Sequence, residues 1–339
     1  MGIFQDTNID TNKFATLSLL FYVAFLIFEP PHAYLLQRLP VAKYLSSMVI
    51  LWGIVVTCTS ACNNYGSLIV TRFLLGAFES AISPALILVT SMWYKRQEQP
   101  RRVGYWYIGV GCAVIFGSIM SFAFQHYQSK IFTSWQIMFL VIGLLTLFWG
   151  AIVFWLLPDN PMSSRLTHNE KIMAIERLRE NKTGIENKHF KPQQAMECLR
   201  DPQVWLISII TIAGSIPNGA IGSFQSILIK SFGFNNKQSA LLQIPSGVIA
   251  IASVLIATYI AGRYNARVLN IIFWNAVGGV LGGCLLAFLP TNAKAGKMAG
   301  LYLNNMVGAF LPCAYSLAAA NFAGHTKKVT MPFSDTKNP

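Results

Sequence analysis

Three charged side chains lie inside long apolar stretches of the sequence. Glu29 lies in the first of these stretches, and Arg72 and Glu79 both lie in the third. A charge in the hydrocarbon core of a membrane costs roughly 2.5–3.5 kcal/mol on insertion scales, so such residues are functional candidates by default. They are therefore the first candidates for a site that handles an ion or a proton.

Arg72 and Glu79 are seven residues apart, which places them on one helix face, with Gly76 between them and Ser83 continuing the stripe. Seven residues rise ~10 Å, so we expect each charge to face a water-filled cavity or another helix rather than its companion. Arginine suits a carboxylate through paired hydrogen bonds. Desolvation favours a protonated carboxylic acid, as a proton carrier requires. A purely structural network between helices is the alternative interpretation.

Glu29 precedes Pro30 and Pro31, and prolines kink a helix and free its carbonyls. Its carboxyl group either faces the cavity as a second proton carrier or accepts hydrogen bonds that repair the helix. After Asp201 the only acid is Asp335, so a proton carrier within the membrane must come from the first half.

The later stretches offer neutral polar side chains as candidate substrate ligands: Gln225, Gln243, Asn304 and Asn305.

The composition is that of a membrane protein. Of the 339 residues, 54% are hydrophobic and 12% are charged, and the mean hydropathy is +0.48. A soluble domain carries about twice that share of charge, so a soluble domain, a disordered chain and a disulfide scaffold are excluded. No phosphate loop, metal cluster or nucleophile constellation appears. We therefore expect no enzyme, no cofactor and no metal.

Nine apolar stretches are long enough to cross a hydrocarbon core, which needs about 20 residues per helix. This predicts an all-α polytopic membrane protein. The stretches are Phe14–Leu36, Tyr44–Cys62, Gly66–Trp93, Gly104–Tyr127, Ser134–Pro158, Gln203–Ile229, Gln238–Ile260, Val268–Leu289 and Met298–Ala323.

The basic residues are distributed unevenly between alternate connections, with 19 on one side and 6 on the other. Because Lys and Arg concentrate in cytosolic loops, this predicts Met1 outside the cell and Pro339 in the cytosol. The net charge is +13, but the basic residues are spread over five separate loops and are not gathered on one face, which argues against nucleic acid as a partner.

The longest connection divides the stretches into five and four. We predict a first helical bundle over 1–158, a cytosolic linker over 159–202, a second bundle over 203–328 and a polar tail over 329–339. Within the linker, Thr167 and Glu170 have capping-box spacing. They predict the start of a short amphipathic helix.

Several short runs match the sequence patterns of one family. Residues 72–79 read RFLLGAFE, followed by Pro84 and by SMWYKRQEQ at 91–99; AGRYNAR stands at 261–267 and NFAGHTK at 321–327. These runs are similar to the fourth-helix and loop signatures of the major facilitator superfamily. Within it, the chain resembles the fungal anion:cation symporters related to allantoate permease, with matches from about residue 14 to 328.

The resemblance implies a fold of twelve helices in two halves, of which the nine stretches match helices two to ten, the chain being truncated at both ends. In related organic-anion transporters, the arginine that matches Arg72 contacts the substrate carboxylate. The glutamate that matches Glu79 takes part in proton coupling.

The implied function is secondary active transport in the plasma membrane, by symport of a proton with a small organic anion. Allantoate, a ureido acid, a vitamin carboxylate and a small peptide-like anion fit this class. Two alternatives remain open at this point: a truncated remnant that no longer transports, and a membrane sensor without flux.

The predicted orientation can be tested by cysteine labelling. An Asn187→Cys variant places a reactive thiol in the linker, which the 19-to-6 distribution of basic residues assigns to the cytosol. An impermeant thiol reagent added to intact cells should leave it unlabelled, and permeabilised cells should restore the labelling. Strong labelling in intact cells would reverse the orientation.

Overall fold

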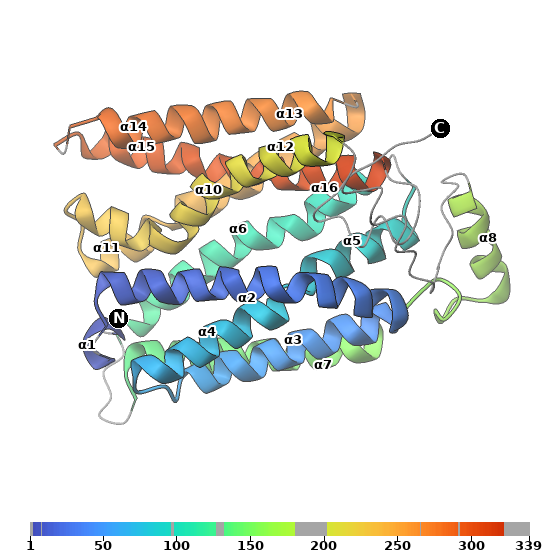
Figure 1. Ribbon diagram of the computed structural model, residues 1–339, viewed down its shortest axis with the longest axis horizontal. Helices are drawn as coiled ribbons and strands as arrows, with labels where there is room; N and C mark the ends of the chain where they lie inside the picture. Colours follow the sequence, from blue (N-terminus) through green and yellow to red (C-terminus); the bar gives the residue numbers. More distant parts are fainter. Residues whose placement is uncertain are drawn as a thin grey trace. The chain divides into compact units, whose positions relative to one another are not determined.

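The computed structural model describes residues 3–7, 9–95, 98–126, 132–179, 202–264, 266–290 and 292–321. These residues are nearly all helical (Figure 1), which confirms the predicted all-α class. The predicted tail over 329–339, residues 180–201 of the predicted linker and the labelling position Asn187 lie outside the described residues.

Seven spans among the described residues are long and apolar enough to cross a membrane. Two further predicted stretches fall on α10 and on the run from α15 to α16, so the count of nine stays a prediction. The spans are α2 (Thr11–Arg38), α3 (Val41–Thr59), α4 (Tyr65–Glu79) with α5 (Ile82–Trp93), α6 (Gln99–Phe124), α7 (Ser134–Leu156), α11 (Asn236–Leu241) with α12 (Ile244–Tyr264), and α13 (Arg267–Trp274) with η1 (Asn275–Leu281) and α14 (Gly282–Phe288). The remaining elements are α1 (Ile3–Asp6), α8 (His168–Arg179), α10 (Pro202–Ser231), α15 (Lys294–Asn304), η2 (Asn305–Ala309) and α16 (Phe310–Asn321).

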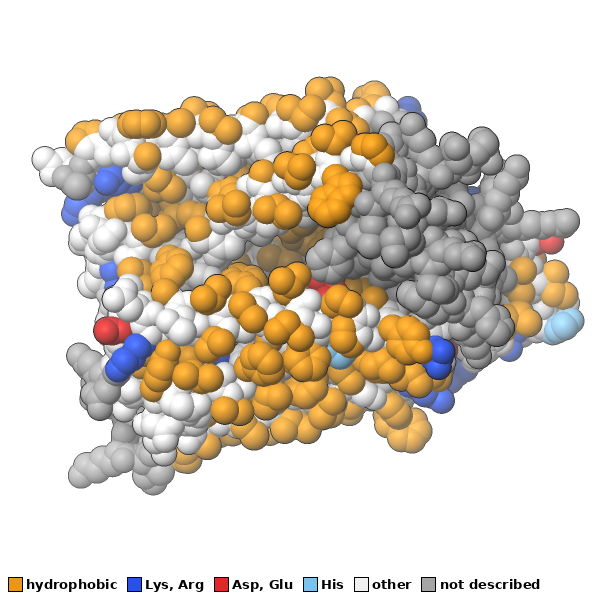
Figure 2. All heavy atoms as spheres, viewed as in Figure 1, with side chains coloured by type: hydrophobic (Ala, Val, Ile, Leu, Met, Phe, Trp, Pro, Cys, Tyr) orange, Lys and Arg blue, Asp and Glu red, His pale blue; other side chains and the backbone are white. Residues whose placement is uncertain are grey.

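The surface of the helices is apolar, as contact with lipid requires. Figure 2 shows hydrophobic side chains along the lengths of the helices, with Lys and Arg side chains gathered toward their ends. On α7, Phe148 is 61% exposed and Trp155 is 76% exposed. Exposed apolar residues of this size suit a hydrocarbon solvent rather than water, so the chain is a multi-pass integral membrane protein.

The chain forms two compact units. Among the described residues, the first unit comprises those within 3–93 and 124–179, and the second comprises those within 94–123 and 202–321. Helix α6 therefore belongs to the second unit, although the predicted first bundle runs through to residue 158. The bundle boundaries given by the sequence stay a prediction.

In the first unit, α2 packs against α4, and α3 packs against α7. Glycines make both contacts close. A Cβ atom on Gly76 would lie 2.2 Å from the backbone oxygen of Phe21, and one on Gly143 would lie 2.2 Å from Oγ1 of Thr57. Small residues that let helix backbones approach are the usual basis of packing between membrane helices.

In the second unit, α12 packs against η2, α13 against α16, and α14 against α15. Val307 and Phe310 are completely buried at the centre of this core, with Val254 and Trp274 beside them. The π-helical segment η1 lies within this packing, where a Cβ on Gly278 would meet the Val307 side chain at 2.7 Å.

Helix α8 begins where the capping-box spacing predicts. The backbone N–H and the hydroxyl of Thr167 each donate a hydrogen bond of 2.8 Å to Oε2 of Glu170. These bonds favour the ionised carboxylate and lower the pKa of Glu170. Leu178 is buried on this helix while Ile172 is 51% exposed, and the amphipathic character of α8 stays a prediction.

The contact at Gly76 generates a stability prediction. Gly76→Ala forces the new methyl group against the backbone of α2, and overpacking of this kind destabilises by about 1–3 kcal/mol. Gly109→Ala is the matched control, because nothing lies within 4 Å of a Cβ atom at that helical glycine. Thermal unfolding in detergent should show a lower melting temperature for Gly76→Ala than for the control, and equal melting temperatures would contradict the close packing.

Candidate functional site

Glu79 stands at a break between two helices of the first unit. Helix α4 ends at Glu79, and α5 starts at Ile82. Pro84 explains the break, because its ring nitrogen cannot donate to the carbonyl of Ser80 and its ring crowds that turn. The predicted continuous stretch from Gly66 to Trp93 is therefore two helices joined at the candidate proton carrier.

The Glu79 carboxylate is half-buried and held from a neighbouring helix. Nε1 of Trp52, on α3, donates a hydrogen bond of 3.2 Å to Oε2 of Glu79. Indole N–H is a donor only, so this contact orients one carboxylate oxygen and leaves the other available. The sequence did not single out Trp52, because a tryptophan in an apolar stretch carries no signal of its own.

Arg72 lies two turns before Glu79 on the same helix and is also half-buried. No ion pair joins the two side chains in the described part of the chain, as expected for groups that are ~10 Å apart along the axis. Their opposite charges still attract each other. The guanidinium group of Arg72 is thus not neutralised by direct contact with Glu79.

Glu29 lies on α2, which continues as one helix through Pro30 and Pro31 to Arg38. Only 6% of Glu29 is exposed, so it is more deeply buried than Arg72 or Glu79. This burial makes Glu29 a costly charge in the membrane. Glu29 therefore stays a second candidate proton carrier, in addition to Glu79.

His32 is a buried polar residue that the sequence analysis missed. Its Nε2 lies 2.9 Å from the carbonyl oxygen of Ala77 on α4, and its Nδ1 contacts the hydroxyl of Tyr44 on α3. A carbonyl only accepts, so Nε2 carries hydrogen, and Nδ1 of the neutral ring accepts from Tyr44. His32 lies three residues after Glu29, on the same helix face, and this spacing was the signal that could have identified it.

The Ala77 carbonyl receives a second hydrogen bond at the same break. The hydroxyl of Ser80 donates to it at 2.7 Å. His32 and Ser80 together supply donors where the regular helix is interrupted. The end of α4 that carries Glu79 is therefore fixed by side chains of α2 and α3 as well as by its own backbone.

In the second unit, two predicted substrate ligands bond within the protein. Gln225 is buried on α10, and its Nε2 donates a 2.7 Å hydrogen bond to Oγ of Ser246 on α12. Gln243 is half-buried between α11 and α12, and its Nε2 donates to the carbonyl of Ser239 at 3.2 Å. Both amides stabilise helix positions, and each keeps its own carbonyl oxygen as an acceptor.

The two asparagines lie where α15 changes into the 3₁₀ segment η2. Asn305 donates from Nδ2 to the carbonyl of Leu301 at 2.9 Å. Asn304 is buried, and its Oδ1 has no hydrogen-bond partner among the residues that the structure describes. An unpaired buried acceptor is costly, and a ligand-binding role for Asn304 stays a prediction.

The predicted residues are divided between the two units. Glu29, Arg72 and Glu79 belong to the first unit, and the four amides belong to the second. Over the described ranges, no group of three His, Cys, Asp or Glu side chains is placed to hold a metal ion.

The His32 network generates a prediction about stability. Tyr44→Phe removes the donor to Nδ1 and leaves a buried acceptor unpaired, which costs about 1–3 kcal/mol. Tyr22→Phe is the control, because Tyr22 is 49% exposed. A lower unfolding temperature is expected for Tyr44→Phe alone. In a cycle with His32→Leu, the two losses should be less than additive, and full additivity would mean that the two rings do not interact.

Comparison with known proteins places the chain in one family. Residues 1–331 match the Major Facilitator Superfamily. Over 94% of its length the chain is 38% identical to the thiamine pathway transporter THI73 of Saccharomyces cerevisiae, and over 98% it is 31% identical to the allantoate permease of the same yeast. An uncharacterized transporter of Schizosaccharomyces pombe is 40% identical over 96% of the chain. The chain spans 62%, 61% and 63% of the lengths of the fission yeast transporter, THI73 and the permease.

Solved structures support the same fold. The proton:xylose symporter XylE aligns with a TM-score of 0.68 at 13% identity, covering 94% of this chain and 74% of XylE. A bacterial homologue of the lysosomal transporter Spinster aligns with a TM-score of 0.64 at 16% identity, covering 94% of this chain and 70% of the homologue. At these identities the likeness concerns the fold alone.

The sequence relatives are named as transporters or permeases rather than enzymes, and they include the allantoate permease that the sequence motifs pointed to. The match extends over nearly the whole chain, and the helices form the fold that the motifs predict. The chain belongs to the Major Facilitator Superfamily.

Proposed function

We propose that the protein is a secondary active transporter that moves a small organic anion together with a proton. The observation that carries this proposal is the pair of half-buried charges on α4. Arg72 and Glu79 share one helix face without pairing directly, and Gly76 between them adds no side chain. Burial of two such charges is costly unless it serves a ligand or a network.

In this proposal Arg72 binds the carboxylate of the substrate. Its planar guanidinium group can donate two parallel hydrogen bonds to a carboxylate, which gives orientation as well as affinity. Glu79 carries the proton, and Trp52 holds one of its oxygens at 3.2 Å while the other is available. Glu29 is the alternative carrier because its carboxyl group is buried on α2 of the same unit.

The charge of Arg72 and the names of the relatives support the proposed substrate class. An allantoate permease and a thiamine pathway transporter are among them, so a ureido acid such as allantoate, a vitamin carboxylate or a small peptide-like anion is the class to test. Asn304 offers an unpaired acceptor for a donor on such a substrate. We place the protein in the plasma membrane, where uptake of such an anion would occur.

The first test is uptake of a labelled carboxylate panel into vesicles. The chain is compared with a version extended at both ends by the corresponding segments of allantoate permease, because the chain spans 63% of that relative. Accumulation under an imposed pH gradient supports the proposal. Uptake by the extended version alone would favour the inactive remnant, and ligand binding without uptake in either version would favour the sensor.

Arg72 and Glu79 should have separable roles in whichever version transports. Arg72→Lys keeps the charge but loses the planar group that donates two parallel hydrogen bonds, so substrate affinity should fall about 10- to 100-fold. Glu79→Gln keeps an acceptor for Trp52 but cannot titrate. It should abolish accumulation driven by the pH gradient and leave exchange of internal for external substrate partly intact, because exchange need not release the proton.

Paired uptake and counterflow measurements separate these outcomes. Arg38→Lys, at the exposed end of α2, serves as the control for the arginine change and should alter neither assay. If Glu79→Gln still accumulates substrate against its gradient, Glu79 is not the coupling group and Glu29→Gln becomes the next test. If Arg72→Lys changes neither assay, Arg72 belongs to a structural network.

A further inference from the structure

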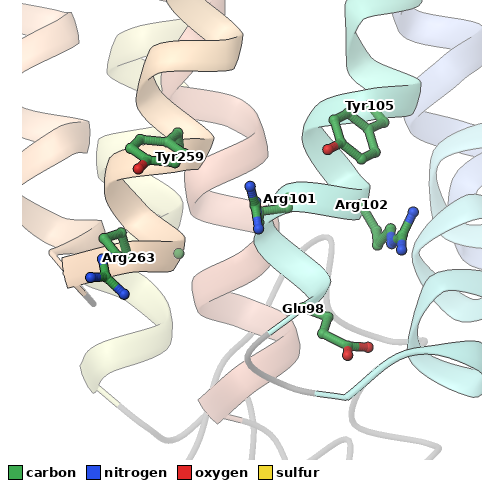
Figure 3. Close-up of a pocket in the computed structure, with 7 residues that line it drawn as sticks. Glu98, Arg101, Arg102, Tyr105, Tyr259 and Arg263 are labelled. Atoms are coloured by element: carbon green, nitrogen blue, oxygen red, sulfur yellow. The ribbon is translucent and has the colours of Figure 1, made fainter.

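A basic pocket lies in the second unit, between the start of α6 and the end of α12 (Figure 3). Its volume is about 400 Å³. Arg101, Arg102 and Tyr105 line it from α6, and Tyr259 and Arg263 line it from α12. None of these residues was assigned a role in transport.

Helix periodicity explains why these side chains meet. Arg101 and Tyr105 are four residues apart on α6, and Tyr259 and Arg263 are four apart on α12, so each helix presents an arginine and a tyrosine on one face. The Arg101 guanidinium carbon lies 5.7 Å from the centre of the Tyr259 ring. Figure 3 shows Arg101 between the two helices, with Tyr259 and Arg263 on the far side of the pocket.

Two small residues set the distance between the helices at this point. A Cβ on Gly104 would lie 2.4 Å from Oγ1 of Thr258, which marks a close approach one turn from the arginines. At Gly262 the nearest atom to a Cβ would be Cγ of Arg101, at 3.4 Å. The helices therefore touch beside the pocket, while the long side chains at their ends surround an open space.

The pocket carries excess positive charge. Arg101, Arg102 and Arg263 are all exposed, and none of the three forms an ion pair with a carboxylate of the described residues. Glu98 also lines the pocket, but its Oε2 accepts a hydrogen bond from the backbone N–H of Lys95 at 3.3 Å. Figure 3 shows its carboxylate directed away from Arg263.

An apolar groove continues from the basic pocket along the same two helices. It has a volume of about 390 Å³ and shares Arg101, Tyr105 and Tyr259 with the pocket. Leu255 and Ile256 of α12 extend it away from the arginines, and both are at least 40% exposed. A charged cavity that opens into an apolar groove matches a ligand with an anionic head and a hydrocarbon tail.

We propose that this pocket and groove bind an anionic phospholipid, with its phosphate group between Arg101 and Arg263 and an acyl chain along Leu255 and Ile256. Guanidinium groups donate paired hydrogen bonds to phosphate oxygens. The distribution of basic residues predicts that both arginine-bearing helix ends lie on the cytosolic side. The cytosolic leaflet is the one that carries anionic lipids, and basic pockets between membrane helices bind their headgroups.

The test measures lipid binding to the purified full chain in detergent by native mass spectrometry. Dioleoyl phosphatidylglycerol is compared with dioleoyl phosphatidylcholine, which has the same acyl chains but no net charge. About tenfold tighter binding of phosphatidylglycerol is expected, since each basic residue contributes about 1 kcal/mol at a membrane surface. Equal binding of the two lipids would overturn the proposal. Glycerol 1-phosphate tests whether a soluble phosphate ester binds as well as the lipid. If it competes at the same concentration as the lipid, the groove contributes no affinity and the lipid assignment is wrong.

Variants show whether binding occurs at this pocket. Arg101→Gln with Arg263→Gln should weaken phosphatidylglycerol binding about tenfold or more and leave phosphatidylcholine binding unchanged, which also reports that the variant is folded. Arg38→Gln with Lys43→Gln is the matched control, because it removes two bases from the same predicted side outside the pocket. An equal loss in both double variants would mean general surface attraction. Leu255→Trp, which fills the groove, should weaken binding with all arginines retained, and an unchanged affinity would exclude the acyl-chain contact.

Discussion

Water is absent from the hydrocarbon core of a bilayer, so each polar group placed there needs a partner within the protein. This constraint is most visible at the break between α4 and α5. The Ala77 carbonyl there accepts from His32 and Ser80, and Trp52 donates to Glu79. Helices α2, α3 and α4 therefore meet at one place through hydrogen bonds as well as apolar packing. The position of Glu79 depends on all three helices.

The same constraint separates polar residues that support the fold from those that can serve a ligand. Gln225 donates to Ser246 and Asn305 donates to Leu301, so these amides stabilise helix positions in the second unit. Arg72 and Glu79 differ from them, since neither neutralises the other and both are only half-buried. A buried charge without a direct counter-ion favours a site that a charged substrate or a proton completes.

The sequence predicted what depends on local patterns. Apolar runs predicted the helical class, and the spacing of Thr167 and Glu170 predicted the start of α8, because capping involves residues three positions apart. Contacts between distant residues were beyond reach. His32 contacts the Tyr44 hydroxyl and the Ala77 carbonyl, 12 and 45 positions away in the sequence. A search for charged residues in apolar stretches does not select a neutral histidine. The grouping of α6 with the second unit also depends on tertiary packing, which a hydropathy pattern does not contain.

Glycines determine where helices touch, and thereby where space remains. In the first unit, Gly76 brings α4 against the backbone of α2 beside the two charges. On α6, Gly104 contacts Thr258 and Gly111 contacts α12 near Gly247, so the two helices approach closely along one face. Arg101 lies in the first turn of α6 and Arg263 in the last turn of α12, and Tyr105 and Tyr259 lie one turn further along each helix. Close backbone contact between α6 and α12 and the basic side chains near their ends together produce the pocket. Close contact alone would leave a packed helix interface, and the basic side chains alone would leave a flat charged surface.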